Sequence, residues 1–285
     1  MEPHRSATTR QEGPVAVGAI GGSGTRMIAQ FMREIGYNMG GDLNGANDNL
    51  WFTLLFKRPD VLIEPRHSFA QLADVFYRRM GGSFAPDELI KSLVMEIASR
   101  PRPQHSAEWL KVRAEALLRH VKTDDRVQPW GWKEPNTHVL IDRFLDFDRE
   151  LRYIHVVRNG LDLAFSENQN QLRLWGSIFL GRMPMVTPRE SLAYWCAVHR
   201  RMRTMMHHYE GRIMQVEFDR FCIEPQSVCR EIVAFVGREA PKVVIDKFAA
   251  TVTVPDSVGQ FRRESTANFE PGDVAYVAEC GFPVS

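Results

Sequence analysis

The chain has 285 residues, 44% of them hydrophobic, which is enough to bury the core of one large α/β domain or two small ones. With 36 basic and 35 acidic side chains its formal net charge is +1, so no overall electrostatic field of the protein attracts nucleic acid or membranes. No apolar run approaches the roughly 20 residues that span a bilayer, so we expect no membrane span.

Residues 1–13 are polar and contain no apolar segment of a secretory signal. We therefore predict a flexible tail over residues 1–13 and a single α/β domain over residues 14–285. The four cysteines, Cys196, Cys222, Cys229 and Cys280, have neither metal-ligand spacing nor a C-x-x-C motif. They are typical of reduced, buried thiols in a cytoplasmic protein, and we expect no metal. The oligomeric state stays open.

A strand, a glycine turn and a helix are predicted over Val15–Tyr37. Val15–Ile20 is apolar, Gly21-Gly22-Ser23-Gly24 interrupts it, and apolar residues then recur at helical spacing. Such a turn directs backbone N–H groups toward the N-terminus of the helix, where an anion is stabilised. A plain flexible turn is the alternative interpretation.

Two common phosphate-binding motifs are absent from this turn. The Walker pattern requires a lysine and then a hydroxyl for magnesium, but Thr25 and Arg26 stand at those two positions. The dinucleotide pattern fails because Ile20 stands two residues after Gly18. The turn therefore suits a phosphate that needs no metal, with Gly21, Gly22, Ser23, Gly24, Thr25 and Arg26 as its binding residues.

A helical insertion is predicted before the second strand. Asp42–Asn49 should be a loop, and Leu50–Phe56 an apolar helix or loop. Three helices with no strand between them follow, over Phe69–Met80, Pro86–Ser99 and Ala107–Val121.

Several aromatic residues are candidates for the wall of an acceptor pocket. They are Trp51, Phe52 and Phe56 in the first apolar segment and the pair Trp130 and Trp132. Because aromatic side chains also build protein cores, both interpretations stay open at this point.

Strands and helices alternate in the second half of the chain. Strands are expected up to Lys133 or Glu134, over Leu151–Val157 and over Arg212–Phe218, and helices over Thr137–Phe147, Leu161–Gln171, Glu190–Tyr209 and Gln226–Val236. This alternation predicts a doubly wound parallel sheet of the P-loop NTPase-like kind, with the helical insertion. Ligands bind at the carboxyl ends of such strands, where Gly22, Lys133, Arg158 and Phe218 would all lie.

Four separated motifs together resemble the sulfotransferases that use 3′-phosphoadenosine 5′-phosphosulfate (PAPS). Ser23-Gly24-Thr25 is similar to their 5′-phosphosulfate loop. Arg158 and Ser166, with Asp162 between them, resemble their pattern Arg-Asp-Pro-x-Asp-x-x-x-Ser for the 3′-phosphate. The resemblance implies that the Arg158 and Ser166 side chains, placed on a strand end and inside the next helix, donate to that phosphate.

The other two motifs lie toward the C-terminus. Phe218 begins a stretch similar to Tyr-Glu-Asp-Leu-x-x-x-Pro, whose aromatic residue lies near adenine in the family. Residues 257–263 resemble Ser-x-Gly-Arg-Trp-Arg, a basic loop near the 3′-phosphate. The resemblance therefore implies that Phe218 and Arg262 bind the nucleotide, although Gln260 departs from the pattern.

The catalytic residues implied by the resemblance are Lys133, Glu134 and His138. Lys133 matches a family lysine that precedes a proline by two positions, and Glu134 or His138 would be the base. Many family members carry Lys or Arg where this chain has Gly22. Arg26 or Lys133 must then supply the missing charge.

The sequence therefore predicts transfer of a sulfuryl group from PAPS, without a metal, to a hydroxyl or amine of a small-molecule, glycan or lipid acceptor. The remaining product would be 3′-phosphoadenosine 5′-phosphate (PAP). The alternatives are a P-loop small-molecule or nucleoside kinase and a non-catalytic protein that binds 3′-phosphoadenosine nucleotides.

Overall fold

The computed structural model describes residues 13–121 and 128–285. Its centre is a four-stranded parallel sheet in the order β2-β1-β3-β4. The strands are β1 (Val15–Ala19), β2 (Gly131–Lys133), β3 (Arg152–Val157) and β4 (Ile213–Glu217). The predicted parallel sheet is confirmed. The predicted tail, apart from Gly13, lies outside the described residues.

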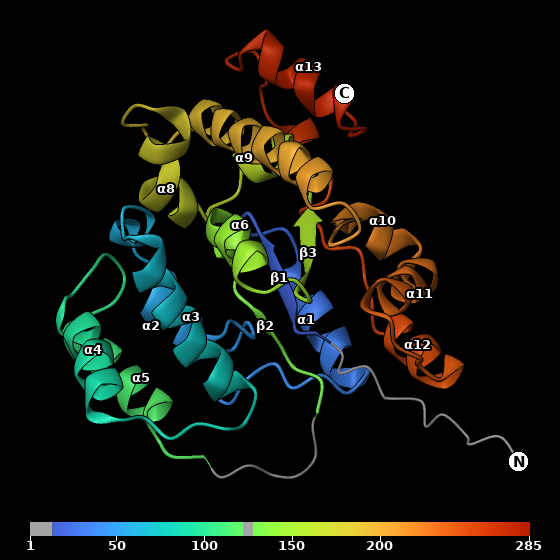
Figure 1. Ribbon diagram of the computed structural model, residues 1–285. Coiled ribbons are helices and arrows are strands. Elements are labelled where there is room, and N and C mark those ends of the chain that lie inside the picture. The colour runs from blue at the N-terminus through green and yellow to red at the C-terminus, as the bar shows by residue number, and fades with distance from the viewer. Residues whose placement is uncertain (1–12, 122–127) are drawn as a thin grey trace, which may run out of the picture.

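Helices cover both faces of the sheet because alternate residues of its buried strands point to opposite sides. Val15 and Val17 pack in one cluster with α1 (Thr25–Glu34), α10 (Phe218–Ile223), α11 (Pro225–Val236) and α12 (Lys242–Ala249). Ala16 and Tyr153 pack in the other with α6 (Thr137–Phe147) and α9 (Pro188–His208). Figure 1 shows α11 and α12 at one side of the sheet and α6 and α9 in front of it.

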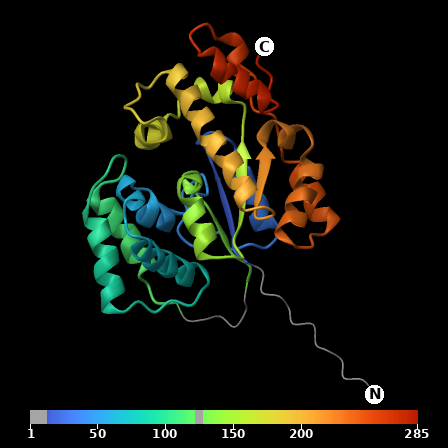
Figure 2. The same cartoon turned by 45° about the horizontal axis from the view of Figure 1, so that its top comes forward.

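The predicted helical insertion forms a lobe beside α6, drawn in blue-green to teal in Figures 1 and 2. It contains α2 (Leu50–Phe56), the short helix η1 (Pro59–Leu62), α3 (Arg66–Met80), α4 (Glu88–Ser99) and α5 (Ala107–Leu117). Part of the predicted 107–121 helix lies beyond Leu117, where the helix has already ended.

The aromatic residues proposed as an acceptor wall belong mostly to the core. Trp51, Phe52, Phe56 and Trp132 are at most 3% exposed. The rings of Phe52 and Trp132 stack with centroids 6.4 Å apart, and Trp130 is a partly buried neighbour. Of the two interpretations of these residues, the core is the correct one for these four.

The predicted helix 161–171 is in fact two helices, α7 (Gly160–Ala164) and α8 (Asn170–Leu180). Between them the Gln169 amide donates to the carbonyls of Leu163 and Ser166, and the Ser166 hydroxyl accepts from the Asn168 N–H. These side chains offer the backbone partners that a continuing helix would otherwise supply. The placement of Ser166 inside a helix was therefore wrong.

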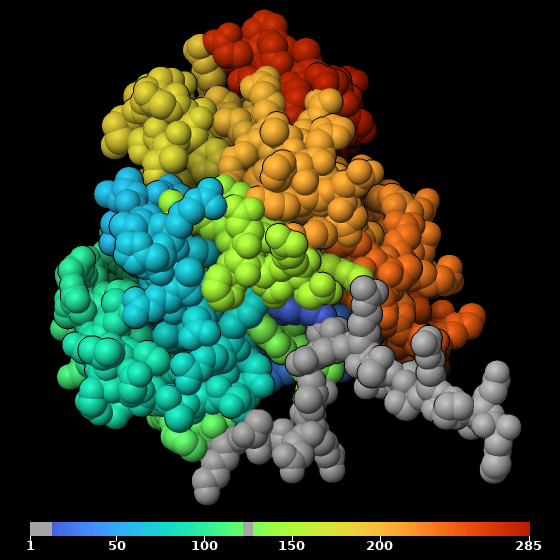
Figure 3. Space-filling model, viewed as in Figure 1, coloured from blue at the N-terminus to red at the C-terminus, as the bar shows by residue number. Residues whose placement is uncertain are grey.

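The C-terminal part of the chain folds back over the carboxyl ends of the strands. It carries η2 (Gln260–Arg263) and α13 (Pro271–Glu279), neither of which was predicted. In Figure 3 this red segment lies against the golden α9 surface. No helix in the described parts of the chain is long and apolar enough to cross a membrane.

Candidate active site

The glycine loop connects β1 to α1 at the centre of the sheet. Gly22 and Gly24 have φ angles of 93° and 86°, in the left-handed region that side chains rarely adopt. Gly24 is the N-cap of α1 and contributes no side chain, so no side-chain oxygen caps the first amides of the helix. This end of α1 therefore keeps backbone donors and a partial positive charge for an anion.

Phe218 packs directly on this loop. A Cβ atom added to Gly24 would lie only 2.1 Å from two carbons of the Phe218 ring. The ring is 4% exposed and begins α10, at the carboxyl end of β4, whereas the sequence had placed it in the strand. The loop thus needs glycine at position 24 for backbone conformation and for contact with an aromatic ring nearly 200 residues later in the sequence.

Arg158 connects three segments of the site. Its guanidinium donates to the Gly22 carbonyl at 3.3 Å and to the Ser257 carbonyl, and its centre lies 5.6 Å from the Phe218 ring centroid. Although the side chain is buried, its Nε has no hydrogen-bond partner within the described residues. An unpaired buried N–H of a cation is a site that an anionic group could occupy.

Asp162 holds the late basic loop in place. Its carboxylate accepts from the backbone N–H groups of Gly259 and Phe261, at 2.8 and 3.1 Å, and lies 3.6 Å from the Arg158 guanidinium. Gln260, the residue that departs from the family pattern, donates to the Asp162 carbonyl at 2.6 Å. Residues 257–263 therefore lie beside Arg158, and the contact of this loop with a nucleotide stays a prediction.

Ser166 and Arg262 lie at the edges of this arrangement. The half-buried Ser166 places its hydroxyl oxygen 3.6 Å from the position of a Cβ on Gly22, so it lies beside the glycine loop. Arg262 is exposed and donates through Nε to the Ser285 carbonyl at 3.3 Å. Arg26 is exposed in the first turn of α1, with no ion pair to any described residue.

Lys133 ends β2, next to the glycine-loop strand, as the sequence predicted. Its ammonium donates to the Ala46 carbonyl at 3.0 Å and to the Asp48 carboxylate, and only 2% of the residue is exposed. The backbone N–H of Asn49 also donates to the Lys133 carbonyl at 2.7 Å. The loop 42–49 therefore covers Lys133 and neutralises its charge.

Glu134 is as buried as Lys133, at 2% exposed, and its carboxylate accepts from the side-chain amide of Asn136 at 2.8 Å. The Lys57 ammonium lies 4.0 Å from it. Burial raises the pKa of the Glu134 carboxyl, while Lys57 opposes that rise. A carboxylate with a raised pKa is a better proton acceptor than an exposed one.

His138 is the second residue of α6, and it is fully buried rather than facing solvent. Its Nδ1 lies 2.9 Å from the Pro135 carbonyl oxygen and its Nε2 3.4 Å from the Tyr194 hydroxyl. Burial lowers the pKa of the imidazole to about 3. The ring faces the interior between α6 and α9, whereas Glu134 faces a cavity.

That cavity, of about 450 Å³, lies between the insertion and the end of β2. Glu134, Asp48, Lys57 and His105 are among its lining residues. Glu134 and Asp48, the partner of Lys133, therefore lie at the same cavity, beside the carboxyl end of β2. Asp48 was not predicted as a site residue, because nothing in the loop sequence indicates a contact with a lysine 85 positions later.

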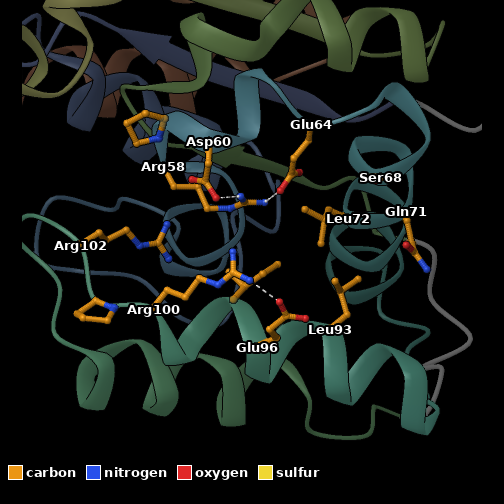
Figure 4. A pocket seen from close by; sticks show the side chains of 13 residues that line it. Arg58, Asp60, Glu64, Ser68, Gln71, Leu72, Leu93, Glu96, Arg100 and Arg102 are labelled. Atoms are coloured by element: carbon orange, nitrogen blue, oxygen red, sulfur yellow. Dashed lines mark hydrogen bonds and ion pairs between the residues drawn. The ribbon is translucent and has the colours of Figure 1, made fainter.

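A second cavity, of about 390 Å³, lies inside the insertion near η1, α3 and α4. Figure 4 shows Arg58 held between Asp60 and Glu64, and Arg100 paired with Glu96. Arg102 caps α2 by donating to the Leu54 and Lys57 carbonyls. Arg58 and Arg100 thus have acidic partners among the lining residues, and none of the residues that line this cavity is a predicted site residue.

Comparison with known proteins shows the family of the chain and the proteins whose fold it shares. Residues 14–242 match the model of a family described as the sulfotransferase family. The fold is similar to the sulfotransferase domain of the olefin synthase of Synechococcus PCC 7002, with a TM-score of 0.50, 13% identity and coverage of 99% of each chain. It is also similar to the sulfotransferase domain of the curacin biosynthetic pathway, with a TM-score of 0.52, 10% identity and coverage of 97% of this chain and 100% of that one. A search of curated proteins found no match.

Proposed function

Because the chain belongs to the sulfotransferase family, we propose that it transfers a sulfuryl group from PAPS to a hydroxyl or amine of an acceptor. The observation that carries this proposal is the position of Arg158. Its buried guanidinium joins the glycine loop to residues 257–263 and retains an unpaired N–H. With Ser166 beside the same loop, it forms a site for the 3′-phosphate that distinguishes PAP and PAPS from other adenine nucleotides.

The residues around this site would bind different parts of the nucleotide. The uncapped amides of α1 would bind the 5′-phosphate, and the Phe218 ring would lie near the base. Arg262 would approach the 3′-phosphate from the exposed side, and Arg26 is a further cation near the loop. The residues present thus fit a doubly phosphorylated nucleotide, and none of these contacts requires a metal.

Lys133 and Glu134 would act on the reacting atoms. Glu134 takes the proton of the acceptor hydroxyl, for which its raised pKa suits it. Lys133 must exchange its contact with Asp48 for the departing phosphate oxygen, on which negative charge builds in the transition state. His138 is the weaker choice for the base because its ring faces Tyr194 inside the core.

The proposal is tested by calorimetry with PAP, AMP, ADP and ATP–Mg²⁺. We expect PAP to bind much more tightly than AMP, and Arg158→Ala to remove most of the difference. Hydrogen bonds to charged groups contribute roughly 1.5–3 kcal/mol each, so the loss should be about tenfold or more. Arg173→Ala, which removes an exposed arginine of α8, is the control. Equal affinity of the wild-type protein for PAP and AMP would contradict the proposal.

A non-catalytic nucleotide-binding protein is the second candidate. Gly22 supplies no cation, and Asp48 occupies the Lys133 ammonium. PAP binding without turnover of PAPS in the presence of any acceptor supports this candidate. Binding that requires ATP–Mg²⁺ supports the kinase, which the absence of a Walker lysine disfavours.

A further inference from the structure

We infer that the cavity beside Glu134 accepts a polyhydroxylated acceptor of the sugar class rather than a phenol, steroid or lipid. This inference rests on the proposed sulfuryl transfer. Eight of the eleven residues that line the cavity are polar or charged, and only Leu43, Leu50 and Trp109 are apolar. A site for an aromatic or steroid alcohol is expected to be predominantly apolar, with few polar groups.

Two buried polar atoms of the lining residues have no hydrogen-bond partner in the described part of the chain. They are Nε2 of His105 and Nε of Arg113. Native proteins leave few buried polar atoms unpaired. Both atoms lie beneath the surface of the cavity, so a neighbouring side chain must move before an acceptor hydroxyl can reach them. Hydroxyl groups both donate and accept, and a sugar ring presents several of them at once.

The charges of the cavity are already balanced. The Lys57 ammonium lies 4.0 Å from Glu134, and the Arg113 guanidinium lies 3.2 Å from the Asp42 carboxylate. Burial and the neighbouring Lys57 lower the pKa of His105 to about 4, so its ring is neutral near pH 7. Among the described residues that line the cavity, no cation is therefore left without an acidic partner, which favours a neutral acceptor.

One wall of the cavity is held rigid by stacking. The His105 ring lies parallel to Trp109, with centroids 4.4 Å apart and planes 22° apart. The Arg113 guanidinium lies 5.3 Å from the centroid of the same indole. The side chains of His105 and Arg113 are therefore packed on one indole in this wall of the cavity.

The transfer itself conserves atoms and charge. The Glu134 carboxylate takes the proton of one acceptor hydroxyl, and the acceptor oxygen forms a bond to sulfur. The bond between sulfur and the bridging phosphate oxygen breaks, and its electron pair stays on the 5′-phosphate of PAP. The remaining acceptor hydroxyls would bind the polar wall formed by His105 and its neighbours.

A site that hydrogen-bonds its substrate rejects an analogue that lacks those groups, by roughly 10⁴–10⁵-fold in the strongest cases. The test measures PAP release from PAPS by the full chain with methyl β-D-glucopyranoside or methyl N-acetyl-β-D-glucosaminide, against 4-nitrophenol and a steroid alcohol. We expect kcat/KM for at least one glycoside to exceed that for 4-nitrophenol by about 100-fold or more. Glycoside rates no greater than the phenol rate, whether both are zero or both are high, overturn the inference.

His105→Phe keeps the ring stacked on Trp109 but removes both ring nitrogens. We expect it to lower kcat/KM for the glycoside at least tenfold, mainly through KM, while PAP affinity changes less than twofold. Gln71→Ala, which alters only the lining of the second cavity, should leave both values unchanged. An unchanged glycoside KM in His105→Phe would show that His105 does not bind the acceptor.

PAP calorimetry distinguishes a failure of the proposed function from a failure of the assigned acceptor class. A protein that does not bind PAP overturns the proposed function. A protein that binds PAP and prefers 4-nitrophenol overturns only the assignment of the acceptor.

Discussion

Lys133 illustrates how a single residue can be well placed by sequence and still have an unexpected partner. Its position beside the glycine-loop strand followed from the predicted sheet, because a strand that ends in Lys-Glu-Pro brings its last side chains to the ligand edge. Its ion pair with Asp48 did not follow, since no local pattern specifies which residue of a loop reaches a buried strand end.

We predict that Lys133→Ala keeps PAP affinity within a few-fold of wild type but lowers kcat by roughly 10²–10³-fold. Removal of one donor to a transition-state oxyanion typically has an effect of that size. Because the variant leaves Asp48 without its cation, the double variant Lys133→Ala/Asp48→Asn is measured beside it. Wild-type turnover in both variants would show that Lys133 does not stabilise the departing phosphate oxygen, and Arg26 would then be the candidate for that role.

Gly24 carries a second prediction at this scale. Gly24→Val should abolish PAP binding, because the side chain would be strained at this φ and would displace Phe218 rather than simply fill the anion site. Gly36→Ala is a matched control, since Gly36 has a φ of 92° but open space around its Cβ position. Calorimetry and thermal melting of both variants separate backbone strain from the contact. Normal PAP binding by a folded Gly24→Val would show that the loop does not bind the nucleotide.

At the scale of elements, the strands were predictable and some helix limits were not. β1 is a run of apolar and small residues, and β3 is mostly apolar apart from Arg152 and His155. Such nearly continuous buried runs indicate central parallel strands without further information. The break at Ser166 depends on side chains that bind the backbone locally, which hydrophobic periodicity does not detect. The burial of Phe52 depends on packing against α3 and α6, far away in the sequence.

The contact between α7 and residues 257–263 gives a prediction about how that loop is held. Asp162→Asn replaces a charged acceptor of two backbone N–H groups by a neutral one, so residues 257–263 should become more mobile. We expect faster amide hydrogen exchange in those residues and a PAP affinity about tenfold lower. Asp60→Asn, in the separate second cavity, is the control. Unchanged exchange in 257–263 would show that Asp162 does not hold the loop.

At the scale of the whole molecule, three buried histidines couple stability to pH. His138, His155 and His199 come from α6, β3 and α9, with neighbouring ring centroids 6.3 and 5.3 Å apart. Burial lowers the pKa of all three, to about 3 for His138 and about 4 for His199. The unfolded chain therefore binds protons first as the pH falls below about 6.5, and acid favours unfolding.

We predict that the free energy of unfolding, measured with urea, falls between pH 7 and pH 5. Each buried histidine contributes about 1.4 kcal/mol per pH unit below its unfolded pKa. His199→Gln should reduce the fall by about 2 kcal/mol. His207→Gln, which alters an exposed histidine of the same helix, should not change it. Equal stability of the wild-type protein at both pH values would contradict the prediction.

The contacts of Arg158 also have a consequence for the order in which the protein is made. This arginine is buried between Gly22 and Ser257, and Asp162 binds Gly259, which comes 97 positions later. A ribosome produces the sheet first, since β4 ends at Glu217. A nascent chain could thus complete its strands while the nucleotide site still lacked one side. Binding of the nucleotide would begin only after residues 257–263 had emerged from the exit tunnel, late in translation.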